Sequence, residues 1–197
     1  MARSPCSSVH PGGSDANLLH AADPSAGLRA LYERHFDVVF RYAASRVGRR
    51  AAEDVVAETF AIAFERRAKF EPASRSALPW LLGIATNVLR SQRRAERRYL
   101  AVGSAPVSAD GRLDHGFEAA DDRVDAVAAR ALILSALRQL SVGEREAFLL
   151  NALAGLTGAD LSVALQVSPG AAAVRLHRAR TKLRQLLGPA LSIGEVI

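Results

Sequence analysis

The sequence predicts an all-α protein made of two small helical domains joined by a flexible linker. Apolar residues recur at spacings of three and four through residues 28–98 and again through residues 126–187, as they do on the buried face of a helix. No stretch alternates apolar and polar residues as a strand does, and there is no internal repeat. Residues 99–125 hold three glycines, a proline and six acidic residues against two arginines, which is typical of a linker. We therefore expect domains at residues 26–98 and 126–188.

The composition indicates a protein that binds a polyanion. Hydrophobic residues make up 49% of the 197 residues, which is enough to form a core in each of two small domains. The formal net charge of +6 comes almost wholly from arginine, because Lys69 and Lys182 are the only lysines, and arginine suits bidentate binding of phosphate. The single cysteine, Cys6, cannot form an internal disulfide, and no apolar run approaches ~18 residues. We expect a cytoplasmic protein with no membrane insertion.

The two ends of the chain are predicted to be tails. Residues 1–25 are rich in Ser, Gly, Pro, Ala and His without a sustained period, and such a segment is expected to be disordered. Residues 189–197 form a short C-terminal tail. His10 and His20 have no cysteine or carboxylate near them at ligand spacing, so we expect no metal site and no cofactor.

The first domain begins with two helices. Apolar residues at helical spacing predict one helix from Leu28 to Ala43 and a second from about Ala52 to Ala68. The second helix turns its apolar stripe, which includes Phe60, inward and presents acidic residues on the opposite side. These acidic residues are Asp54, Glu58 and Glu65. They form either a solvated surface, which the spacing alone favours, or a docking face for a basic partner.

A third helix follows a loop that contains Pro72. Pro79 suits the first turn of this helix, and Leu81, Ile84, Ala85 and Val88 are predicted to face inward. The residues predicted to face outward are Thr86, Asn87, Arg90, Arg94 and Arg97. Trp80 stands at the N-terminal end of the helix, either as an ordinary core residue or as a stacking surface for an unpaired base.

The second domain is predicted to have four helices, the last two of which form a helix-turn-helix. Ser141 and Glu144 have the spacing of a capping box, and Ser168 with Pro169 predicts the start of the final helix. The apolar stripe of that helix consists of Ala172, Leu176, Ala179, Leu183 and Leu187. Its flanks carry Arg175, Arg178 and Lys182 on one side and Arg180 and Arg184 on the other. A helix of this type places its N-terminal part in the major groove, whereas the alternative is a solvated basic face on a packing helix.

Several motifs occur together in a known order. The first domain contains Ala52-Glu53-Asp54-Val55-Val56-Ala57-Glu58-Thr59-Phe60 and Pro79-Trp80-Leu81-Leu82-Gly83-Ile84-Ala85-Thr86-Asn87-Val88-Leu89. The second contains Leu137-Arg138-Gln139-Leu140, Arg145-Glu146, Gly155-Leu156 and Arg175-Leu176-His177-Arg178-Ala179-Arg180. In this order and separation, they resemble a bacterial RNA polymerase sigma factor of the extracytoplasmic-function (ECF) group of the sigma-70 family.

The resemblance implies a region 2-like domain that binds core RNA polymerase and opens the minus-ten promoter element, and a region 4-like helix-turn-helix that reads the minus-thirty-five element. It implies polymerase contacts by Asp54, Glu58 and Phe60. It implies minus-ten contacts by Phe70, Arg75, Trp80, Asn87, Arg90, Arg94 and Arg97, with the loop from Phe70 to Leu78 receiving a flipped base. It implies minus-thirty-five contacts by Ser168, Ala171, Val174, Arg175, Arg178 and Lys182. Members of the group are often held by an anti-sigma protein, which is therefore a further expected partner beside core polymerase and promoter DNA.

The chain departs from the family pattern at a few positions. Ala57 replaces a usual glutamine, Phe64 a common tryptophan, and Gln166 stands at a turn position where glycine is frequent. In the recognition helix, Ala171, Ala173 and Val174 replace polar residues, so we expect methyl contacts with thymine or shape readout in place of hydrogen bonds to bases.

Two other classes of function fit the sequence less well. A stand-alone helix-turn-helix repressor or activator would leave the basic face of the third helix without a role and would normally need a dimer seam, which the sequence does not show. An enzyme would need convergent catalytic groups, yet His35, His115 and His177 are scattered and no phosphate-binding glycine loop is present, so we expect no enzymatic activity.

Overall fold

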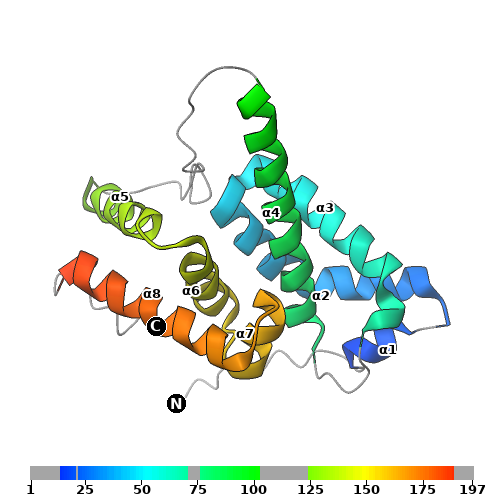
Figure 1. The fold of residues 1–197 in the computed structure, drawn as a ribbon. Helices are drawn as coiled ribbons and strands as arrows, with labels where there is room; N and C mark the ends of the chain where they lie inside the picture. Colours follow the sequence, from blue (N-terminus) through cyan, green and yellow to red (C-terminus); the bar gives the residue numbers. More distant parts are fainter. Residues whose placement is uncertain (1–13, 21, 71–75, 103–123, 189–197) are drawn as a thin grey trace, which may run out of the picture.

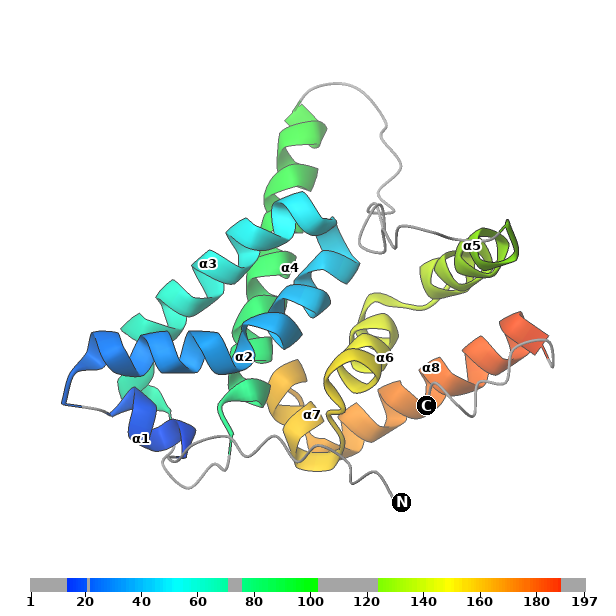
Figure 2. The same cartoon turned by 180° about the vertical axis from the view of Figure 1, so that it is seen from behind.

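The computed structural model describes residues 14–20, 22–70, 76–102 and 124–188, and these residues are helical without a strand (Figures 1 and 2). The helices are α1 (Asp15–Leu19), α2 (Pro24–Val47), α3 (Arg49–Glu65), the short 3-10 helix η1 (Arg67–Lys69), α4 (Leu78–Val102), α5 (Val124–Arg138), α6 (Val142–Ala154), α7 (Gly158–Leu165) and α8 (Pro169–Leu187). The predicted all-α fold is thereby confirmed for the described residues.

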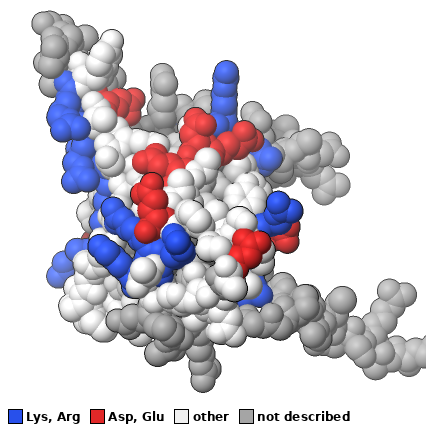
Figure 3. Space-filling model, turned by 90° about the vertical axis from the view of Figure 1, so that its right-hand side faces the viewer, with Lys and Arg blue, Asp and Glu red and all other residues white. Residues whose placement is uncertain are grey.

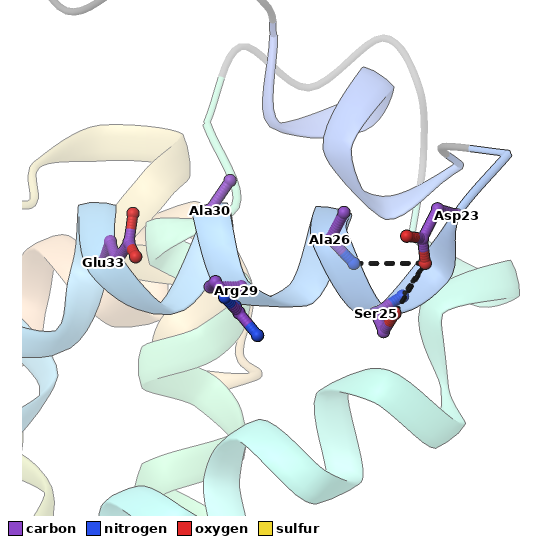
Figure 4. A pocket seen from close by; sticks show the side chains of 6 residues that line it. All are labelled: Asp23, Ser25, Ala26, Arg29, Ala30 and Glu33. Carbon is purple, nitrogen blue, oxygen red and sulfur yellow. Dashed lines mark hydrogen bonds between the residues drawn. The ribbon is translucent and has the colours of Figure 1, made fainter.

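The first domain is a bundle of α2, α3 and α4, and α4 extends beyond the other two (Figure 1). The start of α2 is set by Asp23, whose carboxylate accepts hydrogen bonds from the backbone N–H groups of Ser25 and Ala26 (Figure 4). Leu31, Val39, Phe60 and Leu81 are among the buried residues of this bundle. Their helical spacing in the sequence is what makes the three helices pack on one another.

The prediction that residues 1–25 form a disordered tail is wrong for the segment from Asp15 to Leu19, which forms helix α1. Ser14 accepts a hydrogen bond from the Asn17 N–H and so caps α1, which buries Ala16 and Leu19 against the bundle. A helix of five residues is too short to produce a recognisable period, and an isolated helix of this length is unstable in water. Tertiary contacts therefore order this segment, which the local sequence does not reveal. Residues 1–13 lie outside the described residues.

The second domain contains the four expected helices α5 to α8. Ser141 and Glu144 form the predicted capping box at the start of α6, and Ser168 caps α8 through the Ala171 N–H. Helix α7 is followed by its C-cap residue Gln166, which adopts the left-handed conformation with φ 55°. Because α4 continues to Val102 and α5 begins at Val124, both helices reach into the predicted linker; its remainder, and the tail at 189–197, lie outside the described residues.

The two domains pack directly on each other, a relationship that the sequence pattern does not predict. Helix α4 lies against α7, and α2 against α6, so one apolar core continues from Leu82 and Leu89 of the first domain to Leu161 of the second. The contact is close at Gly83, where a Cβ atom would lie 3.5 Å from the backbone oxygens of Val163 and Ala164. Figures 1 and 2 both show α7 beside the lower half of α4.

Candidate nucleic-acid interface

Helix α3 presents an acidic face to solvent. Its outer side exposes Glu53, Asp54, Glu58 and Glu65, and Gln92 of α4 donates a hydrogen bond to Glu58 at 3.4 Å. Figure 3 shows carboxylate groups gathered on the right-hand side of the molecule as seen in Figure 1, where α3 lies. These two predicted contact residues, Asp54 and Glu58, are therefore accessible to a partner.

Phe60 occupies a different position from these two carboxylates. It is 4% exposed, and its ring centroid lies 4.8 Å from that of Tyr32 in α2. The inward position predicted from the spacing is confirmed, whereas the direct polymerase contact implied by the resemblance does not fit a buried ring. Phe60 instead holds α3 against α2, so the acidic face is presented on a rigid support.

The outer side of α4 is basic. Arg94 and Arg97 are exposed, and Asn87 and Arg90 are half-buried nearer the bundle. In Figure 3, blue groups line the column that rises at the upper left, which is the projecting end of α4 in Figure 1. Thr86, which the spacing predicts to face outward, is instead buried at 1% exposure. Its hydroxyl donates to the Leu82 carbonyl at 2.7 Å and accepts the hydroxyl proton of Tyr42 at 2.9 Å, because the buried Tyr42 needs a polar partner.

The aromatic pair at the start of α4 joins two predicted minus-ten residues. Trp80 is half-buried, and its ring centroid lies 5.3 Å from that of Phe70 at a tilt of 52°. Phe70 is 4% exposed, so it supports Trp80 from the core and does not itself present a stacking surface. Arg75, the other predicted minus-ten residue of the loop from Phe70 to Leu78, lies outside the described residues.

Arg90 forms an ion pair across the domain boundary that sequence reasoning missed. Its Nε donates to Glu146 Oε1 at 3.1 Å and its Nη2 donates to Oε2. This hydrogen-bonded pairing with Glu146 raises the pKa of the Arg90 guanidinium although burial opposes the shift. On the other side of Glu146, Arg46 Nη2 of α2 lies 3.6 Å from Oε1. Glu146 is thus a buried carboxylate of the second domain held by two arginines of the first.

The helix-turn-helix exposes only part of the predicted minus-thirty-five set. Ser168, Val174 and Arg178 are exposed, and Ala171 is half-buried at the start of α8. The guanidinium of Arg175 lies over Gly143 of α6, where a Cβ would be 3.4 Å from its Nε. Lys182 donates to the Gln139 carbonyl at the end of α5. The structure therefore gives Arg175 and Lys182 contacts within the domain, while the N-terminal half of α8 keeps an accessible edge.

Within the described ranges, no helix combines the length and the apolar character needed to cross a membrane. Among the same residues, no three His, Cys, Asp or Glu side chains come together as possible ligands of a metal ion.

Comparison with known proteins places both domains in one family. Residues 31–99 match the family described as Sigma-70 region 2, and residues 130–183 match Sigma-70, region 4. The ECF RNA polymerase sigma factor SigL of Mycobacterium tuberculosis is 34% identical over 168 residues, which cover 85% of this chain and 92% of SigL. The RNA polymerase sigma factor CarQ of Myxococcus xanthus is 36% identical over 159 residues, which cover 80% of this chain and 87% of CarQ.

A solved structure shares the arrangement of helices. CnrH, determined in complex with the cytosolic domain of CnrY, superposes with a TM-score of 0.61 at 26% identity over 89% of this chain and 97% of CnrH. The match with SigL spans nearly the whole of that relative, and both helical domains match sigma-70 regions in the same order. The chain therefore belongs to the ECF group of the sigma-70 family of RNA polymerase sigma factors, which direct promoter-specific transcription initiation.

Proposed function

We propose that Asp54 and Glu58 of α3 bind core RNA polymerase, that α4 with Trp80, Asn87 and Arg90 binds the melted minus-ten element, and that the exposed edge of α8 reads the minus-thirty-five element. One observation carries this assignment. The bundle separates exposed carboxylates on α3 from arginines on α4, so a protein with basic docking groups and a negatively charged DNA strand would meet different sides of one rigid unit.

The chemistry of α4 suits an unpaired DNA strand. A half-buried indole at Trp80 offers a stacking surface, the amide of Asn87 can exchange hydrogen bonds with a base edge, and Arg94 and Arg97 supply charge for phosphates along the projecting helix. On α8 the exposed residues include Ala173, Val174 and Arg178. This set favours methyl contacts and phosphate binding over bidentate base readout.

The packing of the domains implies that promoter binding follows a rearrangement. Arg90 is paired with Glu146, and α7 covers the part of α4 around Gly83. A DNA strand that follows the outer side of α4 would compete with the second domain for Arg90. We infer that the closed arrangement is the state before promoter engagement, and that the second domain leaves α4 when Arg90 contacts DNA.

A regulatory partner is also proposed. CnrH was solved with the cytosolic domain of CnrY, and a Bartonella quintana sigma factor RpoE was solved with the anti-sigma factor NepR. CnrH shares 26% identity and nearly full coverage with this chain. We infer that an anti-sigma protein holds this sigma factor as well, and affinity capture of the full chain from its native host followed by mass spectrometry tests this inference.

In vitro transcription with core polymerase and the promoter of the protein's own gene tests the proposed function. Reversal of both Asp54 and Glu58 to Arg is expected to abolish co-purification with core polymerase and transcription while circular dichroism is unchanged, because exposed charges contribute little to folding. Reversal of Glu33 and Asp37, two exposed carboxylates on α2, makes the same charge change and should have no such effect. Core binding retained by the α3 variant would refute the assignment of the acidic face.

A second assay separates strand capture from ordinary phosphate binding. Asn87→Ala and Trp80→Phe are expected to lower open-complex formation on duplex promoters more than binding to premelted promoters, since melting depends on capture of the unpaired strand. Arg41→Ala, which removes an exposed arginine from α2, is the matched control. Equal losses on both templates would contradict a role for this side of α4 in opening the promoter.

A further inference from the structure

Asp15 is a buried carboxylate whose bonds join three segments of the first domain. It is 2% exposed at the start of α1. Its Oδ1 accepts a hydrogen bond from Arg34 Nη1 at 2.5 Å. Its Oδ2 accepts hydrogen bonds from His35 Nε2 at 2.8 Å, the Ala77 N–H at 2.6 Å and the Ser76 hydroxyl at 3.2 Å. The carboxylate thereby ties α1 and α2 to the residues that lead into α4.

The bond to Ala77 acts at the N-terminal end of the longest helix of the described residues. The Leu81 N–H donates to the Ala77 carbonyl, so Ala77 is the N-cap residue of α4, one position before Leu78. The first N–H groups of a helix lack partners within it, and a negative charge there is favoured by the helix dipole. Asp15 therefore fixes the direction in which α4 leaves the bundle as well as satisfying one of its free N–H groups.

Trp80 lies within one turn of this anchor. Its indole packs on the buried ring of Phe70 at 5.3 Å between centroids, so the start of α4 is held by an aromatic contact on one side and by the Asp15 carboxylate on the other. Neither holding group is on α4 itself. A loss of the Asp15 bonds would remove the polar contacts at the start of α4 and leave Trp80 held by apolar packing, which includes the Phe70 contact.

We propose that Asp15 is a positioning residue for minus-ten recognition: its carboxylate fixes the N-terminal end of α4, and with it Trp80, so that an unpaired promoter base meets a preformed surface. This proposal rests on the proposed role of α4 in binding the melted strand. The side chains of a binding site must be held within about 0.5 Å of their productive positions by the groups around them. Asp15 supplies that support from α1, through its bonds to Ser76 and Ala77.

Asp15→Asn is a specific test because it replaces a carboxylate oxygen, which accepts hydrogen bonds, by an NH₂ group, which donates them, without changing the size of the side chain. The donors of Arg34 face Oδ1, and the donors of His35, Ser76 and Ala77 face Oδ2, so whichever way the amide is turned, its NH₂ group faces another donor. Asp23→Asn is the matched control. Asp23 is an exposed aspartate that caps α2 (Figure 4), and asparagine caps helices about as well as aspartate does.

The experiment uses holoenzyme reconstituted from core polymerase and the full chain, with a set of premelted promoters that carry each base at each minus-ten position. For Asp15→Asn we expect the preference for the best base over the others to fall by roughly tenfold at one or two positions, the equivalent of one hydrogen bond to a charged group. Affinity for core polymerase should not change. Asp23→Asn should reproduce the wild-type preferences.

The outcomes separate this proposal from a structural role. If Asp15→Asn lowers binding to all templates in the same proportion, it has only reduced the active fraction and the proposal is overturned. Failure of the wild-type chain to initiate transcription would instead overturn the proposed function. If circular dichroism shows that Asp15→Asn does not fold, Ser76→Ala is the second variant. It removes the 3.2 Å bond to Asp15 together with the 3.2 Å bond from the Leu78 N–H to the same hydroxyl, and it should still reduce the preference for the best base. Unchanged preferences in that variant would overturn the proposal.

Discussion

Arg90 and Glu146 lie 56 positions apart in the chain and form a two-point ion pair that joins α4 of region 2 to α6 of region 4. Glu146 is 1% exposed, and its other cationic neighbour, Arg46, is also buried. Among the residues that the structure describes, the Nε and Nη1 atoms of Arg46 have no hydrogen-bond partner. Glu146 therefore has two hydrogen bonds from Arg90 but only a longer ionic contact with Arg46. Arg90 is thus the stronger of the two connections between Glu146 and the first domain.

Glu146→Gln is expected to open the interface. Removal of one partner from a buried ion pair costs about 3 kcal/mol, which corresponds to a shift of roughly 100-fold in the ratio of open to closed molecules. The free sigma factor should therefore bind promoter DNA more tightly in the absence of polymerase, and its radius of gyration in small-angle X-ray scattering should increase.

Asp160→Asn controls for this experiment because it removes one negative charge from an exposed position of the same domain. A general electrostatic effect on DNA binding would appear in both variants, whereas opening would appear only in Glu146→Gln. An unchanged radius of gyration in Glu146→Gln would show that the ion pair does not hold the domains together.

Gly83 provides an uncharged test of the same interface. A Cβ at this position would lie 3.5 Å from the α7 backbone, which is ordinary van der Waals contact, so Gly83→Ala should preserve the closed form and stabilise α4 by up to about 1 kcal/mol. Gly83→Leu has no room beside that backbone and should open the domains as Glu146→Gln does. Scattering profiles and urea unfolding of the two variants check this prediction, and a closed Gly83→Leu protein would contradict it.

Asp15 predicts a specific dependence of stability on pH. Burial by itself would raise the pKa of Asp15, but hydrogen bonds from His35, the Ala77 N–H and Arg34 hold it well below the ordinary value of 3.8. A carboxyl group with a lowered pKa in the folded state stabilises the fold fully above its unfolded pKa and loses that contribution as the pH falls through its folded pKa. The difference in unfolding free energy between wild type and Asp15→Asn should therefore be largest near neutral pH and shrink below about pH 4. A difference that stays constant between about pH 6 and pH 2 would refute the coupling.

The backbone conformation of Gln166 leads us to expect that a substitution by glycine is stabilising. It is the non-glycine residue of the described chain with a positive φ, and the left-handed conformation disfavours a side chain with a Cβ. Gln166→Gly should raise the unfolding free energy by about 1 kcal/mol. Because Gln166 lies in the turn before α8 and not on the groove-facing edge, preferences at the minus-thirty-five element should be unchanged, as a binding series on mutated promoters would show.

Local rules predict most of the helices and their ends. Ser141 with Glu144, and Ser168 with Pro169, mark helix starts because their partners are three residues away or fewer, and the structure confirms both. The apolar stripe of α8 is likewise buried as predicted, from Ala172 to Leu183.

Contacts between residues that are far apart in the chain explain where the sequence-based predictions are wrong or incomplete. The groups that donate hydrogen bonds to Asp15 lie 19 to 62 positions away in the chain. The local sequence around Asp15 therefore predicts a disordered tail. Thr86 is turned inward by the hydroxyl of Tyr42, which is 44 positions distant. The packing of α7 on α4 and the pairing of Arg90 with Glu146 depend on how two separately predicted domains meet, and no local period contains that information. Among the site residues, the sequence therefore predicts which side chains are basic or acidic, but not which of them are already engaged.

Under the proposed assignment of the two sides of region 2, their uneven availability sets an order of events. In the closed arrangement, Asp54 and Glu58 remain open to solvent, whereas Arg90 is occupied by Glu146. A chromosome offers on the order of a million or more non-specific sites, which would retain a free sigma factor whose DNA-binding surface stood open. A sigma factor whose polymerase-binding carboxylates are accessible while its DNA-binding arginine is still paired would bind polymerase before it binds a promoter. The search for the promoter would then be made by the holoenzyme.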